Sequence, residues 1–285
     1  MRQAKANMQA VMFYAPQMNA SASEALAMES RLRRAIERGE FVLHYQPKVR
    51  LSDRRICGVE ALIRWQDPDH GLIPPMKFIP FLEEAGLIAS VGRWALQRAL
   101  QDLNGWTEGG AAPVRVAVNV SPLQLNQGDF VQQLRELLAS AAREDCLELE
   151  ITENVIMDDV DNKIGMLEEI RAMGVSVAID DFGTGYSSLA YIARLPITSL
   201  KIDRSFVTDM VGGPGGYVLV SSVIALAHAL NLQVVAEGVE TEEQARLLQL
   251  LACDEAQGYL FGKPLPADQL FQLLASGEPL PKAGG

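Results

Sequence analysis

Eight short apolar segments, most of them separated by amphipathic helical patterns, constrain the fold of this chain more than any other feature. The segments lie at residues 41–49, 56–65, 114–121, 146–152, 176–182, 199–203, 233–239 and 256–261. Helical spacing begins at residue 24 and returns at 78–86, 90–106, 129–143, 160–174, 217–231, 241–252 and 266–277. Segments such as SVAI (176–179) are apolar on both faces, as buried parallel strands are. The 285 residues suffice for one barrel of about 250 residues.

The connection between the first two segments, VRLSDRRI (49–56), contains no helical pattern. Two parallel neighbours need a crossover of about a dozen residues or more, so these two strands are expected to form an antiparallel hairpin. The sequence therefore predicts an α/β fold, a TIM-like (β/α)8 barrel with an antiparallel first strand. The alternative is an open doubly wound sheet, which would carry a glycine fingerprint after its first strand, where QPKVRLSD stands instead.

Composition excludes several classes of function. The formal net charge of −11 argues against a basic surface for DNA or RNA. Cys57, Cys146 and Cys253 lack metal-site or disulfide spacing and are interpreted as free thiols of a cytoplasmic protein. No apolar run reaches about 18 residues, so no membrane contact is expected. The glycine-rich stretch 212–216 is interpreted as a flexible connection, since no Lys-Ser/Thr follows it.

Polar residues recur at the C-terminal parts of the predicted strands. They are Glu60, Asn119, Glu150, Glu153, Asp180, Asp181, Lys201, Glu237 and, at the start of the last strand, Gln257. In a barrel these positions meet at the face where active sites are built. A buried unpaired carboxylate costs several kcal/mol, so a cluster of carboxylates calls for cations between them.

The candidate ligands Glu60, Asn119, Glu150, Asp180, Asp181 and Glu237 all offer oxygen atoms. Oxygen ligands without His or Cys favour Mg²⁺ or Mn²⁺ over zinc. Asp180 and Asp181 point to opposite faces of a regular strand, so the strand is expected to end or distort there, as the glycines that follow permit. Two ions about 3.5–4 Å apart would then suit phosphoester hydrolysis, with Lys201 holding the attacking water. Lys201 could instead act as the base of an enolase-type reaction, and the pattern does not separate the two.

The chain resembles the EAL domain family of cyclic di-GMP phosphodiesterases over about residues 24–277. The motifs that carry the resemblance are YQPKV, EALIRW, FIPFLEEAGLI, NVSPLQL, LEITE, IDDFGTGYSSL, LKIDRSFV, VVAEGVET and QGYLFGKPLP, in family order. The resemblance implies a (β/α)8 barrel whose first strand is antiparallel. It also implies hydrolysis of cyclic di-GMP to linear pGpG with two ions of Mg²⁺ or Mn²⁺.

The resemblance implies a role for each matched residue. Glu60, Asn119, Glu150 and Asp180 would be metal ligands, and Asp181 would serve the second ion. Glu237 would hold a metal or its water, Lys201 the nucleophilic water, and Gln257 would lie close to both. Gln46 and Arg64 would contact the substrate, Arg64 at a phosphate, and Glu153 would anchor the loop after Asp181. The set is complete, which favours an active enzyme over a catalytically silent cyclic di-GMP receptor.

The resemblance also implies a domain organisation. Residues 1–22 would be a linker left from a preceding GGDEF domain, residues 23–278 the phosphodiesterase domain, and residues 279–285 a disordered tail. An unrelated polar leader is the alternative for residues 1–22. The parent protein, which could be membrane-anchored, would carry upstream GGDEF or sensor domains. A homodimer would couple the loop after Asp181 to a neighbouring helix.

Overall fold

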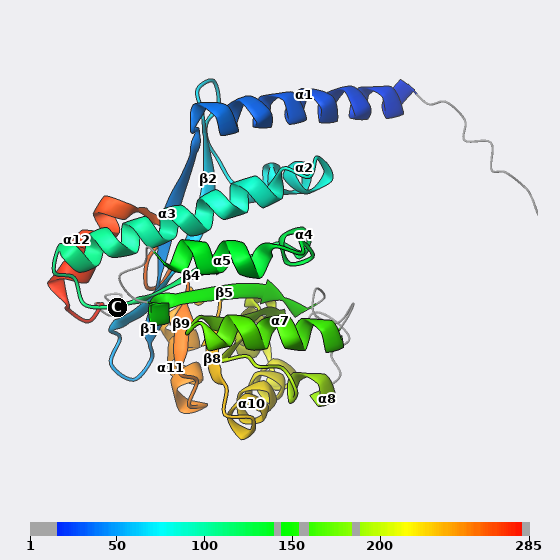
Figure 1. Ribbon diagram of the computed structural model, residues 1–285. Helices are drawn as coiled ribbons and strands as arrows, with labels where there is room; N and C mark the ends of the chain where they lie inside the picture. Colours follow the sequence, from blue (N-terminus) through cyan, green and yellow to red (C-terminus); the bar gives the residue numbers. More distant parts are fainter. Residues whose placement is uncertain (1–15, 140–143, 154–159, 184–188, 281–285) are drawn as a thin grey trace, which may run out of the picture.

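A closed barrel of eight strands forms the centre of the protein in a computed structural model, which describes residues 16–139, 144–153, 160–183 and 189–280 (Figure 1). Around the barrel the strands are β1 (Phe41–Arg50), β2 (Ile56–Asp67), β4 (Arg115–Asn119), β5 (Leu147–Thr152), β6 (Ser176–Phe182), β7 (Ser199–Ile202), β8 (Gln233–Ala236) and β9 (Glu255–Gln257). Pairing of β1 with both β2 and β9 closes the ring. The closed ring confirms the predicted barrel and rules out the open doubly wound sheet.

The first strand runs against both of its neighbours in the barrel. Lys48 of β1 lies opposite Gly58 of β2 and opposite Gln257 of β9, and both pairings are antiparallel. The other barrel strands, β2 and β4 to β9, are parallel to one another. The predicted antiparallel first strand is therefore confirmed, and the short β1–β2 connection is its cause.

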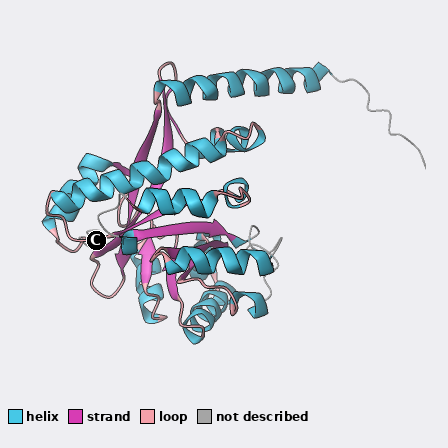
Figure 2. Cartoon of the chain, in the orientation of Figure 1, coloured by secondary structure: helices cyan, strands magenta, loops and turns pink. Residues whose placement is uncertain are grey.

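Helices cover the outside of the barrel, as Figure 2 shows. The larger ones are α3 (Ile88–Glu108), α5 (Phe130–Leu138), α7 (Val160–Ala172), α9 (Arg204–Gly212), α10 (Pro214–Ala229), α11 (Glu242–Leu250) and α12 (Ala267–Ser276). Shorter helices are α2 (Ile79–Glu84), α4 (Pro122–Leu125) and α8 (Leu189–Ile192), with 3-10 turns at Pro75–Lys77 and Glu144–Cys146. The main core lies between these helices and the outward faces of the strands, where Leu149, Val177 and Leu200 are fully buried.

A second, smaller core lies where β1 and β2 extend beyond the barrel. The short strand β3 (Gly71–Ile73) pairs with the end of β2, and β10 (Leu265–Pro266) pairs with β1. Helix α1 (Pro16–Arg38) packs across this extension together with α2, and its N-terminal part projects away from the barrel (Figure 1). Trp65 and Phe78, which are buried beneath α1, form an edge-on aromatic pair with their ring centroids 6.2 Å apart.

Several segments differ from their sequence-based expectations, among them α1, α9 and β9. Helix α1 begins at Pro16 rather than at residue 24, since proline is well suited to the first turn of a helix. Helix α9 was not predicted, and its end at Gly212 leads directly into α10, so the 212–216 stretch joins two helices rather than forming a flexible connection. Strand β9 ends at Gln257 instead of continuing to residue 261. A side chain at Gly258 would lie 2.1 Å from the carbonyl oxygen of Val239, because the chain turns closely past it.

The structure describes only parts of the predicted N-terminal linker and C-terminal tail. Residues 1–15 of the predicted linker and 281–285 of the predicted tail lie outside the described residues, and Pro16–Ala22 belong to α1. The boundary at residue 23 and the GGDEF origin of residues 1–22 stay predictions. Within the described ranges, none of the helices combines the length and the apolar character that crossing a bilayer requires.

Candidate metal-dependent active site

Polar side chains line the inside of the barrel because alternate residues of each strand face inward. The register places Gln46 opposite Glu60, and Asn119 beside Glu150. Although these strands carry apolar residues on their outward faces, the inward positions hold buried polar groups: Gln46, Lys48, Glu60, Glu148, Glu150, Asp180, Ser199, Lys201, Glu255 and Gln257. The barrel interior is therefore a polar core surrounded by an apolar one.

Lys201 of β7 is the centre of the acidic cluster. Its Nζ lies 2.6 Å from Glu150 Oε2, 2.7 Å from Glu237 Oε1 and 3.1 Å from Asp180 Oδ1. The side chain is 1 % exposed, so these three carboxylates replace the water that would solvate its ammonium group. The structure thus brings together four of the residues that the sequence predicted.

Lys48 and Glu148 form a second layer beneath this cluster, and neither was predicted as a site residue. Lys48 Nζ lies 2.8 Å from Glu148 Oε1 and 2.6 Å from Glu150 Oε1, with all three side chains almost fully buried. The signal available in the sequence is that Lys48 stands two residues after Gln46, and Glu148 two residues before Glu150. Each therefore shares the inward face with a predicted residue.

Amides connect the remaining predicted residues on the other side of the site. Asn119 Nδ2 donates to Glu60 Oε1 over 2.7 Å, and Gln257 Nε2 donates to Glu60 Oε2 over 2.5 Å and to Gln46 Oε1 over 2.9 Å. Gln46 in turn donates to the carbonyl of Gly262. Among the described residues, Gln257 Oε1 is a buried acceptor without a hydrogen-bond partner, so an oxygen is left free to accept at this point of the site.

Asp180 and Asp181 reach the same region because β6 is distorted at its end. Asp181 has a φ of 54°, in the left-handed region, and the β6–β7 register shifts between Ile179 and Phe182. Carboxylate oxygens of Asp180, Asp181 and Glu237 lie within 4.8 Å of one another, a spacing that a metal ion could bridge. The expected distortion is confirmed: Asp181 itself takes the left-handed conformation, and Gly183 after it also has a positive φ, of 94°.

The electrostatics of the cluster favour bound cations. The charged residues that interact electrostatically in this cluster are two lysines and six acids, namely Lys48, Lys201, Glu60, Glu148, Glu150, Asp180, Asp181 and Glu237. When all are ionised, the carboxylates outnumber the ammonium groups by four. Burial, with Asp180 and Glu60 adding to it, raises the pKa of Glu237 to about 8 against the opposing effect of Lys201. Burial also raises the pKa of Glu60, with Glu150 and Asp180 adding to the effect.

Glu150 is the exception among these acids. Burial tends to raise its pKa, but Lys201 and Lys48 outweigh burial and bring the pKa down to about 2. Glu150 is therefore the carboxylate that the protein itself keeps ionised, whereas Glu60 and Glu237 lack full compensation. A divalent cation bound by oxygen ligands would supply the missing positive charge.

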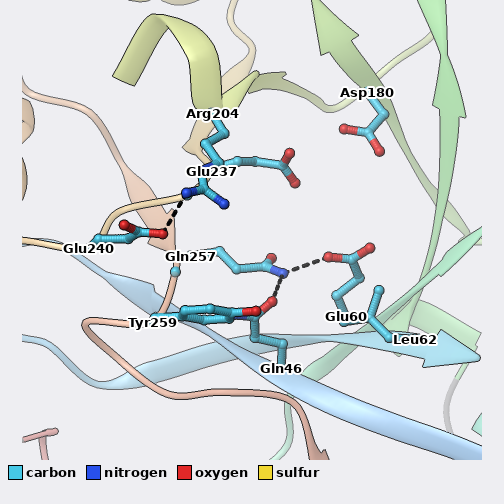
Figure 3. A pocket seen from close by; sticks show the side chains of 11 residues that line it. Gln46, Glu60, Leu62, Asp180, Arg204, Glu237, Glu240, Gln257 and Tyr259 are labelled. Atoms are coloured by element: carbon cyan, nitrogen blue, oxygen red, sulfur yellow. Dashed lines mark hydrogen bonds and ion pairs between the residues drawn. The ribbon is translucent and has the colours of Figure 1, made fainter. Parts of the chain in front are cut away.

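A cavity of about 250 Å³ opens beside the acidic cluster, at the C-terminal ends of the parallel strands (Figure 3). Its lining includes Glu60, Asp180, Glu237, Gln46 and Gln257, and also Leu62, Arg204, Gly238, Glu240, Gly258 and Tyr259. In Figure 3 the tyrosine ring and the Arg204–Glu240 pair lie on different sides of the opening. Sequence reasoning missed Arg204, Glu240 and Tyr259, which come from loops and from the start of α9, where strand periodicity gives no signal.

The two remaining predicted residues lie at the edge of the site. Arg64 is half-buried on β2, and its Nη1 donates to the carbonyl of Ile63. It is not one of the described residues that line the cavity. Glu153 is buried, and its Oε2 accepts from the backbone N–H of Gly183 over 3.2 Å. This is the contact that the predicted loop-anchoring role requires, although residues 184–188 lie outside the described residues.

Comparison with known sequences identifies the family. The family model described as EAL domain matches residues 29–264. The chain is 46% identical over 264 residues to MucR of Pseudomonas aeruginosa, named a bifunctional diguanylate cyclase/cyclic di-GMP phosphodiesterase. It is 43% identical to NbdA of the same organism and 40% identical to PdeR of Escherichia coli, both named cyclic di-GMP phosphodiesterases. These matches cover 92%, 92% and 89% of this chain but only 38%, 34% and 38% of the relatives, so the chain spans well under half of their length.

Solved structures agree with the sequence comparison. The MucR phosphodiesterase in complex with c-di-GMP superimposes with a TM-score of 0.83 at 46% identity, covering 86% of this chain and 99% of that one. The EAL domain of Mycobacterium smegmatis DcpA superimposes with a TM-score of 0.72 at 37% identity, covering 84% and 99%. With the polar barrel interior, the distorted end of β6 and the matched motifs all in place, the chain belongs to the EAL domain family.

Proposed function

We propose that this chain hydrolyses cyclic di-GMP to linear pGpG in a reaction that depends on two divalent cations, Mg²⁺ or Mn²⁺. The observation that carries the proposal is the acidic cluster around Lys201, which has an excess of four negative charges when every group is ionised and which opens into the cavity. Two divalent ions would balance that excess. The names of MucR, NbdA and PdeR support the choice of substrate and reaction.

In this proposal Glu60, Asn119, Glu150 and Asp180 hold one cation, and Asp181 serves the second beside Glu237. When bound, the cations would provide Lewis-acid activation and charge neutralisation. Gln257 Nε2 fixes the Glu60 carboxylate, and Gln257 Oε1, which has no hydrogen-bond partner among the described residues, adds an acceptor to the same wall of the site. The residues present thus fit a pair of hard cations with oxygen ligands.

Lys201 orients the water that attacks the phosphorus atom, and one P–O ester bond breaks to open the ring. Its ammonium group suits this role because three carboxylates hold it in place and keep it charged. Gln46 and Arg64 bind the dinucleotide, with Arg64 turning from the Ile63 carbonyl toward a phosphate. Glu153 anchors the loop after Asp181 through its bond to Gly183.

The deciding experiment incubates the purified chain with cyclic di-GMP and Mg²⁺ and separates the products by chromatography. Formation of pGpG that stops in EDTA is the expected result. Binding of cyclic di-GMP without turnover would favour the receptor alternative and overturn the enzymatic proposal. Glu60→Gln keeps the shape of the side chain and should abolish turnover; retained activity would overturn the metal assignment.

We further propose that the chain forms a homodimer and is part of a longer protein with an upstream GGDEF domain. Exposed apolar residues gather at the junction of α9 and α10: Val211, Tyr217, Val218 and Leu219. Gly183 lies so close to Phe206 of α9 that a Cβ there would stand 3.0 Å from the ring. A partner bound at this junction would therefore act on the helix that contacts the start of the loop after Asp181.

A further inference from the structure

Lys48 is a fully buried cation that the proposed reaction does not use. It lies on β1, the antiparallel strand, directly opposite Gly58, and its side chain is 1 % exposed. Lys48 is not one of the described residues that line the cavity. Its ammonium group therefore does not directly contact a ligand bound there. Its role must therefore be exerted through the residues that it contacts.

The contacts of Lys48 converge on Glu150. Lys48 Nζ lies 2.6 Å from Glu150 Oε1, while Lys201 Nζ lies 2.6 Å from Glu150 Oε2. The Glu150 carboxylate is thus held at both oxygens, from β1 on one side and from β7 on the other. Two charge-assisted hydrogen bonds at opposite ends of a planar group fix its rotation as well as its position.

Glu148 completes the arrangement from below. Glu148 Oε1 lies 2.8 Å from Lys48 Nζ, and its Oε2 accepts from the Ser199 hydroxyl over 3.4 Å. The contacts form a chain of alternating charge, in the order Glu148, Lys48, Glu150 and Lys201. When all four are ionised, their charges sum to zero. Glu148 balances Lys48, which leaves Lys48 able to hold Glu150 without adding positive charge to the metal site above.

We propose that Lys48 is a positioning residue for the hydrolytic site, which it serves by fixing the Glu150 carboxylate and, through it, the Lys201 ammonium group. The inference rests on the proposed function, since Glu150 is taken there as a metal ligand and Lys201 as the group that orients water. Partners that orient a metal ligand in this way typically contribute 10- to 100-fold to metal affinity or activity. Loss of Lys48 would leave Glu150 held at one oxygen only and free to rotate toward Lys201.

The test separates this role from simple charge balance in the core. Lys48→Met alone leaves Glu148 buried without its cation and is expected to destabilise the fold. The double variant K48M/E148Q removes the cation and its balancing anion together, and Glu148→Gln alone is the matched control. Each variant is measured for its thermal midpoint, for kcat and KM with cyclic di-GMP, and for the Mg²⁺ concentration that gives a half-maximal rise in the midpoint.

We expect the double variant to fold with a thermal midpoint close to that of the native chain. Its kcat should fall at least 10-fold with little change in KM, and it should need at least 10-fold more Mg²⁺. Glu148→Gln keeps the Lys48–Glu150 contact but leaves Lys48 without its balancing anion, so its kcat should stay near native and its Mg²⁺ requirement should rise less than that of the double variant. If the methionine variant fails to fold, K48Q/E148Q retains an amide at this position and is held to the same expectations.

Native kcat and native Mg²⁺ dependence in the folded double variant would overturn the inference and leave the proposed function standing. An equal loss in Glu148→Gln alone would also overturn it, because the effect would then belong to Glu148. If the native chain shows no hydrolysis while the double variant needs 10-fold more Mg²⁺, the proposed function fails and the positioning of Glu150 by Lys48 is supported.

Discussion

Lys201 and Glu150 form an ion pair in which Nζ and Oε2 lie 2.6 Å apart, and neither side chain is more than 1 % exposed. The pair joins β7 to β5 across the strand that carries Asp180, so the end of β6 lies between its two members. Because Asp180 and Glu237 contact the same ammonium group, a change at Lys201 reaches every acid on this side of the cavity.

Replacing Lys201 should therefore abolish turnover. Lys201→Met keeps the length of the side chain but removes the charge, and we expect kcat to fall at least about 100-fold, as for the loss of an oriented electrostatic group. Chromatographic detection of pGpG measures the effect, and Lys77→Met, at an exposed lysine of the Pro75–Lys77 turn, is the control. Native kcat in Lys201→Met would remove Lys201 from the mechanism.

Divalent cations should stabilise the fold as well as support turnover. In the proposed mechanism Mg²⁺ binds the carboxylate cluster of the folded state, and a ligand at 100 times its Kd adds about 2.7 kcal/mol to the free energy of unfolding. Thermal unfolding with MgCl2, against KCl at equal ionic strength, should show a higher midpoint only with Mg²⁺. Asp180→Asn should reduce that rise. An equal midpoint in both salts would argue against a specific site.

The stability that Asp67 provides should depend on pH. Burial alone would raise the pKa of this carboxyl, but hydrogen bonds from the side chains of Arg31 and His70 and from the backbone N–H groups of Asp69 and His70 outweigh burial and lower it. A lowered pKa means that the contribution is complete above the unfolded value of about 4 and is lost as the pH falls below it. Asp67→Asn should cost about 1–3 kcal/mol at pH 7.

Urea unfolding at pH 7 and at pH 3 checks this prediction, because the difference between the native chain and Asp67→Asn should shrink at the lower pH. The contact attaches α1 to the end of β2, so α1 should also become more accessible to proteases in the variant. A difference that is the same at both pH values would show that ionisation of Asp67 is not its source.

Gly238 should be needed for the shape of the cavity mouth. Its φ is 64°, and a Cβ there would lie 2.2 Å from Cγ of Arg204, whose guanidinium group pairs with Glu240 over 2.8 Å. Gly238→Ala should displace Arg204 and raise the KM for cyclic di-GMP several-fold, beyond the backbone strain of about 1–2 kcal/mol. Gly71→Ala has a similar φ of 71° with open space around it, so it isolates the strain. Equal KM values in the two variants would contradict the prediction.

The junction of α9 and α10 should be the dimer contact. Val218 is 59% exposed there, and an arginine would add a buried unpaired charge to the proposed interface. We expect Val218→Arg to convert the dimer into a monomer in size-exclusion chromatography with light scattering. Leu250→Arg makes the same change at a 70% exposed residue of α11 and should leave the dimer intact. A monomeric native chain would dismiss the interface.

The barrel and most of its site could be predicted because both follow from periodicity. Strand spacing gave the closed sheet, and the short connection after β1 gave its antiparallel direction. Helix α9 was missed because it has nine residues and fully buries only Val207 and Met210, with Phe206 partly buried, which is too short a stretch for a clear periodic signal. At Asp181 the sequence predicted that the strand would distort but not which residue would do so. The left-handed conformation of Asp181 depends on the contacts that surround it in the fold.

The cavity residues that lie outside the strands could not be predicted from the sequence. Arg204, Glu240 and Tyr259 reach the cavity through a helix start and two loops, and their direction depends on close packing such as that of Arg204 against Gly238. Lys48 was missed for a different reason. A lysine near the end of a strand is usually solvated, and only the three-dimensional pairing with Glu148 and Glu150 shows that it is not.

The reversed direction of β1 changes where the polypeptide enters the barrel. In an all-parallel barrel the first strand would start at the base, whereas Phe41 of β1 here lies opposite Trp65, near the end of β2 that leads to the cavity side. Helix α1 therefore joins the barrel on the side of the opening. Any domain fused ahead of α1, natural or engineered, would be connected to the barrel on the cavity side, through a helix of 23 residues whose movement would be transmitted to the β1–β2 extension.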